Sequence, residues 1–234
     1  MHEVMKRVVP LANKTELLKV TPVGPNNSGK SYFVNNLAMA KNLDELATAK
    51  IPTIPEFQLR WANFLPVESS SLGRGGEVVT LFPTVLRFIP HGFKVKLELT
   101  SEADFKLRLK IYQQRLSNRL PSPEFAQLRD QLGQFLQEHF PPAFQEFQKF
   151  QQQQLLDGGK EIVSLFEKNE PSNIFEQLHY FRTSVIKDLE VLVRNNPILC
   201  WMFVVVVEGN FKNLNDLGIQ IIDVSLFAFP LQFF

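Results

Sequence analysis

The sequence contains a single cysteine and has no surplus charge of either sign. One thiol cannot form an intramolecular disulfide or the cysteine-rich ligand set of a structural zinc site, so we expect a reducing, cytoplasmic environment. The 25 basic side chains are matched by 24 acidic ones, which leaves a formal net charge of +1. Nucleic-acid-binding domains usually carry a marked basic excess, so we expect no nucleic-acid partner.

Long hydrophobic runs are also missing. The most apolar internal stretch, residues 198–207, has ten residues, whereas a helix that crosses a bilayer needs about 20. Four consecutive valines, Val204–Val207, favour a buried strand there. Residues 1–10 have no apolar segment of the kind a signal peptide needs. We therefore predict neither a membrane span nor a secretory leader.

The composition is that of an ordinary globular protein, and the order of the predicted elements is that of an α/β chain. In the first half this order is strand, turn, helix and then further strands. The apolar fraction of 44% and the charged fraction of 21% are close to those of ordinary domains. Residues 17–23 predict a strand, residues 24–29 a glycine- and asparagine-rich turn, and residues 30–41 a helix. Further on, 78–88 and 94–99 alternate as strands do, and Pro-His-Gly at 90–92 predicts a hairpin turn between them.

Residues 101–195 predict helices, after which the chain returns to strands at 198–207 and 218–224. Ser101 precedes acidic residues and is a candidate N-cap. Phe144, Phe147 and Phe150 recur at helical spacing and define one apolar face.

A phosphate-binding loop is the strongest motif in the chain. Residues 24–31 read Gly-Pro-Asn-Asn-Ser-Gly-Lys-Ser and match the pattern G-x-x-x-x-G-K-[ST], between a predicted strand and a predicted helix. Such a loop turns its backbone N–H groups toward phosphate, while Lys30 contacts the β- and γ-phosphates and the Ser31 hydroxyl binds Mg²⁺. The expected nucleotide contacts are Gly24, Asn27, Ser28, Gly29, Lys30, Ser31 and Tyr32.

A second metal ligand is expected at the end of a neighbouring strand. Asp223 follows the apolar run 218–222 and is preferred, because these sites use aspartate, over Glu208, which follows the valine run. Asp223 lies 193 residues beyond Lys30, so a large insertion must separate them. We therefore predict an α/β fold with a P-loop NTPase core and a large helical insertion. Its first part is residues 1–100, its helical insertion is 101–195, and its returning strands are 196–234.

These stretches resemble the dynamin family of large GTPases. Residues 23–31, with Asn36 in the following helix, are similar to that family's first GTPase motif. Residues 78–86, in which Thr80 is followed by Pro83, resemble its switch I, and residues 218–223 resemble the strand that enters its D-x-P-G motif. The three stretches occur in the family's order.

The resemblance implies roles for individual residues. Thr80 would complete the Mg²⁺ shell with Ser31 and Asp223, and would hold the attacking water through its backbone. Asn26 and Asn27 stand where the family has a Gln-Ser pair that positions the water and compensates charge. With Lys30 and Thr80 they are the candidate catalytic residues. Arg74 is a weaker candidate, and a solvated loop arginine is the alternative. The resemblance also implies GTP as substrate, Mg²⁺ as cofactor, self-association and peripheral membrane contact.

The sequence departs from the family at two motifs. After Asp223 it reads Val-Ser-Leu in place of x-Pro-Gly, and it contains no T/N-K-x-D base-recognition motif. The chain therefore corresponds to the N-terminal part of such a GTPase domain, incomplete at its C-terminus, and the apolar tail 226–234 is interpreted as core sequence without its neighbours. Two alternatives stay open: an ATP-binding P-loop protein of another lineage, and a hydrolysis-deficient nucleotide-binding scaffold.

Basic residues on the first predicted helix of the insertion are a second open question. They could contact acidic lipid headgroups, or they could form an ordinary solvated face, because acidic residues are interspersed among them. The residues concerned are Lys106, Arg108, Lys110 and Arg115.

Overall fold

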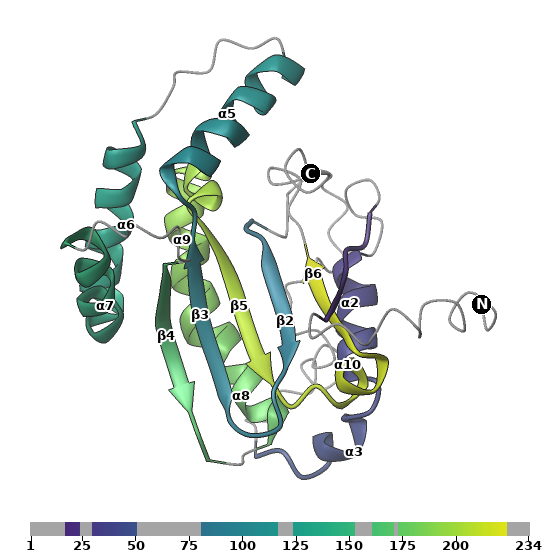
Figure 1. Cartoon of the computed structure of the whole chain (residues 1–234). Coiled ribbons are helices and arrows are strands. Elements are labelled where there is room, and N and C mark those ends of the chain that lie inside the picture. Colours follow the sequence, from purple (N-terminus) through teal and green to yellow (C-terminus); the bar gives the residue numbers. More distant parts are fainter. Residues whose placement is uncertain are drawn as a thin grey trace, which may run out of the picture.

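The chain folds around a six-stranded mixed sheet with helices packed on it, as a computed structural model shows (Figure 1). The structure describes residues 17–23, 30–50, 81–116, 124–152, 161–170 and 173–223. The strands are β1 Leu18–Val20, β2 Thr84–Phe88, β3 Phe93–Leu99, β4 Ile162–Lys168, β5 Phe203–Gly209 and β6 Ile219–Asp223. The helices are α2 Lys30–Met39, α3 Leu43–Leu46, α5 Glu102–Leu116, α6 Phe125–His139, α7 Pro141–Gln152, α8 Ile174–Tyr180, the π-helix η3 Phe181–Ile186, α9 Lys187–Asn195, the 3₁₀-helix η4 Pro197–Trp201 and α10 Lys212–Leu217. The predicted α/β class is confirmed.

The strand order in the sheet is β1-β6-β2-β5-β3-β4. β1 pairs parallel with β6, and β2 pairs parallel with β5. The pairs β6–β2, β5–β3 and β3–β4 are antiparallel. The first predicted strand and helix are confirmed as β1 and α2, and the last two predicted strands as β5 and β6.

The predicted hairpin between residues 78–88 and 94–99 is wrong. β2 and β3 follow each other closely in the chain, but β5 lies between them and bonds to both. The Ile89 N–H donates to the Gly209 carbonyl at 2.9 Å, so the short connection crosses the end of β5. β5 suits this central position because Val205, Val206 and Val207 are completely buried.

The helical prediction for residues 101–195 is confirmed for most of its length and fails at one strand. Residues 162–168 form β4, an edge strand paired with β3. The predicted N-cap of the first helix is confirmed, because the Asp104 N–H donates to the Ser101 hydroxyl at 3.1 Å. Phe147 is completely buried on α7, with Phe144 and Phe150 partly buried beside it. The division into core and insertion at 100 and 195 stays a prediction.

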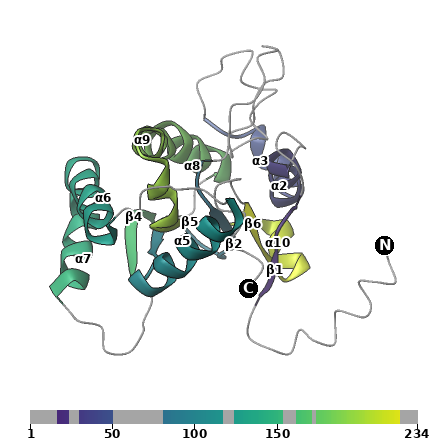
Figure 2. The ribbon, with the colours of Figure 1, turned by 90° about the horizontal axis from the view of Figure 1, so that it is seen from above.

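Phenylalanine fills the core on one face of the sheet. Seen from above, α8, α9 and α2 lie on the same side of the sheet (Figure 2). On this side Phe93 of β3 meets Phe181 of η3 edge to face, with ring centroids 6.4 Å apart. The sequence has 22 phenylalanines, and among the described residues those at 93, 105, 147, 175, 181, 203 and 211 are fully buried.

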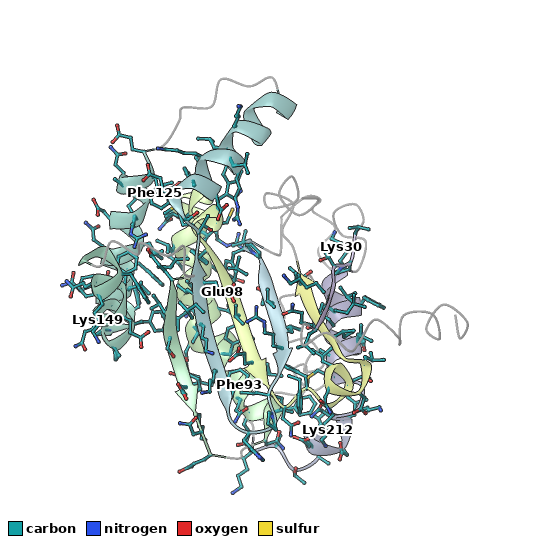
Figure 3. All side chains as sticks on the ribbon, viewed as in Figure 1. Lys30, Phe93, Glu98, Phe125, Lys149 and Lys212 are labelled. Atoms are coloured by element: carbon teal, nitrogen blue, oxygen red, sulfur yellow. The ribbon has the colours of Figure 1, made fainter. Side chains whose placement is uncertain are left out.

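The opposite face of the sheet carries a network of half-buried charges centred on Arg87 of β2. Arg87 donates to Gln220 Oε1 on β6 at 2.8 Å and to Glu98 Oε1 on β3 at 3.1 Å. It also lies 3.8 Å from Glu208 on β5, which in turn accepts a 2.7 Å hydrogen bond from Lys96. Glu98 lies over the middle of the sheet in Figure 3. One arginine therefore links β6, β2, β5 and β3 by side-chain contacts.

Among the described residues, no helix is both long and apolar enough to cross a membrane. Of the strand predicted at 198–207, residues 203–207 belong to β5, whereas 198–201 lie in the 3₁₀-helix η4.

The single cysteine, Cys200, is completely buried in η4. Burial raises the pKa of its thiol from the ordinary value of 9.0 to about 12, and the nearby Arg108 opposes this only in part. We expect Ellman's reagent at pH 8 to label Cys200 at the rate of unfolding, and within seconds in denaturant. Rapid labelling of the native protein would contradict the burial.

The same shift has a consequence for stability in alkali. The unfolded chain loses the thiol proton near pH 9, while the folded chain keeps it until about pH 12. The contribution of this thiol is therefore fully present below pH 9 and is lost between about pH 9 and 12. Cys200→Ala has no thiol and should lose this component of the pH dependence.

Candidate functional site

Three strands and one helix meet at one edge of the sheet. β1 and β6 run parallel, with Leu18 opposite Ile219 and Val20 opposite Ile221, so both strands end at the same edge. β2 runs the other way and begins there, because Thr84 lies opposite Asp223. α2 also begins at this end of the molecule, near the upper tip of β6, where Lys30 is labelled in Figure 3. The edge therefore gathers the residues that the sequence placed at the start and the end of the predicted nucleotide site.

Lys30 is the first residue of α2 and is half-buried. The first N–H groups of a ten-residue helix have no acceptor within the helix, and the helix dipole adds partial positive charge at the same end. The first turn contains no acidic side chain that would oppose an anion. This end of α2 has the electrostatic character that phosphate binding requires.

Asp223 is the last residue of β6 and is completely buried. Residues two apart in a strand share a face, so Asp223 lies on the side of Ile221. Ile221 belongs to the same buried cluster as Val34 and Ala38 of α2. Asp223 therefore lies on the face of the sheet that α2 covers, at the end where α2 begins.

The donor chemistry at this edge fits Mg²⁺. Magnesium in nucleotide sites takes one or two carboxylates, and phosphate and water oxygens complete its octahedron. Asp223 would be the carboxylate and Ser31, in the first turn of α2, the hydroxyl. Among the described residues, no group of three or more His, Cys, Asp or Glu side chains could hold a metal by itself. Such a site would therefore depend on the phosphates for part of the coordination shell.

Glu208, the alternative carboxylate, is engaged elsewhere. It lies opposite Arg87 on β2, three residues along that strand from Thr84, or roughly 10 Å at the rise of a β-strand. Its side chain is on the polar face, in ion pairs with Arg87 and Lys96. The structure thus favours Asp223 over Glu208 as the residue near α2.

Several predicted site residues lie outside the part of the chain that the structure describes. These are Gly24, Asn26, Asn27, Ser28, Gly29, Arg74, Thr80 and the tail 226–234. Ser31 and Tyr32 belong to the α2 backbone, but their side chains are also outside the description. Lys30 and Asp223 are therefore the two predicted site residues whose surroundings can be compared, and they lie at the same edge of the sheet.

A cavity of about 540 Å³ opens at the other end of α2. Its lining residues are Lys41, Asp44, Phe88, Asn210, Lys212, Asn215 and Asp216. Its cations are paired, because Lys41 bonds to Asp216 and Lys212 bonds to Glu45 at 2.7 Å. The hydrogen bond from Lys41 lowers the pKa of Asp216, and the one to Glu45 raises the pKa of Lys212. These internal pairs make the cavity a poor candidate for a phosphate site.

Lys106 and Arg108 of α5 do not lie on the same surface, and the side chain of Arg115 is outside the described part of the chain. Lys106 is exposed and pairs with Glu102 at 2.6 Å, one turn earlier. Arg108 is half-buried and its Nη1 approaches the Thr100 hydroxyl at 3.4 Å and the Trp201 carbonyl at 3.5 Å. Burial lowers the pKa of Arg108, while Asp104 acts in the opposite direction. Arg108 therefore points toward the protein, away from any lipid surface that Lys106 would face.

No protein-family model matches the chain, and no curated protein matches it.

Proposed function

We propose that the protein binds a nucleoside triphosphate with Mg²⁺ through a P-loop at residues 24–31. The observation that carries the proposal is the meeting of α2 and β6: the helix that follows the motif begins at the edge where the parallel neighbour of β1 ends in buried Asp223. A P-loop core requires this arrangement, with phosphate at the helix N-terminus and the metal carboxylate on an adjacent strand. The strand order places β6 directly beside β1, as that chemistry needs.

The preferred substrate is GTP, hydrolysed in the manner of dynamin-like proteins. The support is the resemblance of residues 78–86 to switch I, together with the position of β2. Thr84 begins β2 opposite Asp223, and Thr80 is four residues earlier, which is at most about 14 Å of extended chain. Thr80 is thus within reach of the Lys30–Asp223 edge. In this role it would bind Mg²⁺ and hold the attacking water.

A second candidate is a nucleotide-binding scaffold that does not hydrolyse. Val224, Ser225 and Leu226 follow Asp223 where the related GTPases have x-Pro-Gly, so the glycine that senses the γ-phosphate is missing. ATP is the alternative nucleotide, because the sequence has no guanine-recognition motif. For the cell we propose a cytoplasmic protein that self-associates and contacts membranes only peripherally.

Titration of the whole chain with fluorescent GTP and ATP, each with and without Mg²⁺, tests the proposal. We expect Mg²⁺-dependent binding with a preference for GTP, and phosphate release if the protein hydrolyses it. A preference for ATP would favour the other P-loop lineage. Binding without phosphate release would favour the scaffold, and absence of binding to either nucleotide would overturn the proposed function.

A further inference from the structure

Asn42 joins two segments that lie far apart in the chain. It follows α2 at the end opposite Lys30 and is completely buried. Its Nδ2 donates to the Asn210 carbonyl at 2.9 Å and to Glu45 Oε1 at 3.1 Å, and its Oδ1 accepts from the Lys212 N–H at 3.1 Å. One side chain therefore satisfies backbone groups on both sides of the turn that leads from β5 into α10.

Further contacts join the same two segments. The Asn213 side chain donates to the Leu37 carbonyl at 2.6 Å, which satisfies one of the last free carbonyls of α2. Ion pairs add to this at the surface, between Lys41 and Asp216 and between Lys212 and Glu45. We call the side-chain amide contacts of buried Asn42 and half-buried Asn213 the α2–α10 joint.

Two elements, α2 and β6, lead from the joint to the candidate site. α10 ends at Leu217, and Gly218 alone separates it from β6, so a shift of α10 along the α2 axis would move β6 with it. α2 has ten residues and spans about 15 Å, and β6 has five residues and spans about 17 Å. Both elements run between the joint and the edge that carries Lys30 and Asp223. The joint holds the C-terminal end of α2 next to the start of β6. It therefore fixes the position of Lys30, at the other end of α2, relative to Asp223, at the other end of β6.

We propose that Asn42 is a positioning residue for the phosphate and metal site, which holds the metal carboxylate of β6 in register with the phosphate-binding end of α2. The inference rests on the proposed function. Asn42 is the member that should matter most, because a buried amide with three hydrogen bonds leaves unsatisfied backbone groups when it is removed. The exposed pair of Lys41 and Asp216 spans the same elements but should contribute little, since exposed ion pairs are weak and screened.

The test compares nucleotide affinities of the folded whole chain with and without Mg²⁺. In Asn42→Ala we expect affinity for Mg²⁺–GTP to fall about tenfold, while affinity for GTP in EDTA changes less than threefold. The reason is that Lys30 contacts the nucleotide directly, with or without Mg²⁺. Asp223 on β6 acts on the nucleotide only through the metal, so a change in its position affects Mg²⁺-dependent binding alone. Lys41→Ala is the matched control and should stay within twofold of the wild type in both conditions.

The outcomes separate the inference from the function on which it rests. Unchanged Mg²⁺–GTP affinity in Asn42→Ala, or equal losses with and without Mg²⁺, would overturn the positioning role while the wild type still binds nucleotide. If the wild type binds none, both proposals fail. Should Asn42→Ala not fold, as judged by circular dichroism, Asn213→Ala replaces it. That variant loses a single hydrogen bond of the joint, and the same selective loss of Mg²⁺–GTP affinity is required of it.

Discussion

Lys30→Ala should weaken nucleoside triphosphate binding by about a hundredfold, the largest functional effect that we expect from one substitution. A hydrogen bond to a charged group contributes up to about 3 kcal/mol, which corresponds to roughly that factor in affinity. Lys30 stands at the first position of α2, where the helix N–H groups already favour an anion. Its removal leaves the phosphates with the backbone and the dipole alone. Isothermal titration with GTP, with and without Mg²⁺, measures the loss.

Lys41→Ala provides the matched control for this experiment. It removes the same charge from the C-terminal side of α2, where Lys41 pairs with Asp216 at the surface. A general electrostatic attraction between the chain and the nucleotide would weaken by similar amounts in both variants. Equal affinities of the wild type and Lys30→Ala would mean that residues 24–31 do not form a phosphate-binding loop.

Gly92→Ala should lower the free energy of unfolding by about 3 kcal/mol or more. Gly92 has φ of +77°, a left-handed conformation that costs a residue with a Cβ about 1–2 kcal/mol. A Cβ at this position would also lie 2.6 Å from the Lys168 carbonyl oxygen and 3.3 Å from the Asn169 Cα. Both are backbone atoms at the end of β4, so relief requires a shift of the strand, and overpacking of this kind adds about 1–3 kcal/mol.

Gly218→Ala separates the two causes. Gly218 also has a positive φ, of +62°, but a Cβ there would meet no atom within 4 Å. We expect a loss of only about 1 kcal/mol, the conformational cost alone. Urea denaturation followed by circular dichroism gives both values. Similar losses in free energy of unfolding in the two variants would show that the close approach of Gly92 to β4 does not add to the cost of a side chain there.

Local patterns were enough to predict the elements that frame the candidate site. β1, α2 and β6 each have an apolar run or a helical period next to glycine, so a local pattern indicates them even though β1 and β6 pair across about 200 residues. The position of β5 could not be predicted in this way. Valine-rich sequence indicates a buried strand, but its insertion between β2 and β3 depends on pairing with residues more than a hundred positions earlier. β4 was missed because it is an edge strand that lies in the chain between helical segments.

The residues of the candidate site also differ in whether a local pattern predicts them. Lys30 and Asp223 stand out because each residue type follows a recognisable run, and motif chemistry assigns them roles. Asn42 carries no such signal, since an asparagine after a helix indicates only that the helix ends. Its significance depends on Asn210 and Lys212, about 170 residues further along, which no local pattern connects to it.

The crossing of the β2–β3 connection over the end of β5 also bears on how the protein folds. β2 and β3 are neighbours in the chain, yet they must stay about 10 Å apart until a strand made more than a hundred residues later enters between them. The fastest pairing available to a nascent chain, a local hairpin of β2 with β3, would occupy the edges that β5 needs. β2 and β3 therefore cannot reach their native places in the sheet before residues 203–209 are made, and contacts of such long sequence separation predict slow folding. In a ribosome-bound chain that ends before β5, we expect β2 to pair with β3, a pairing that the native sheet does not contain.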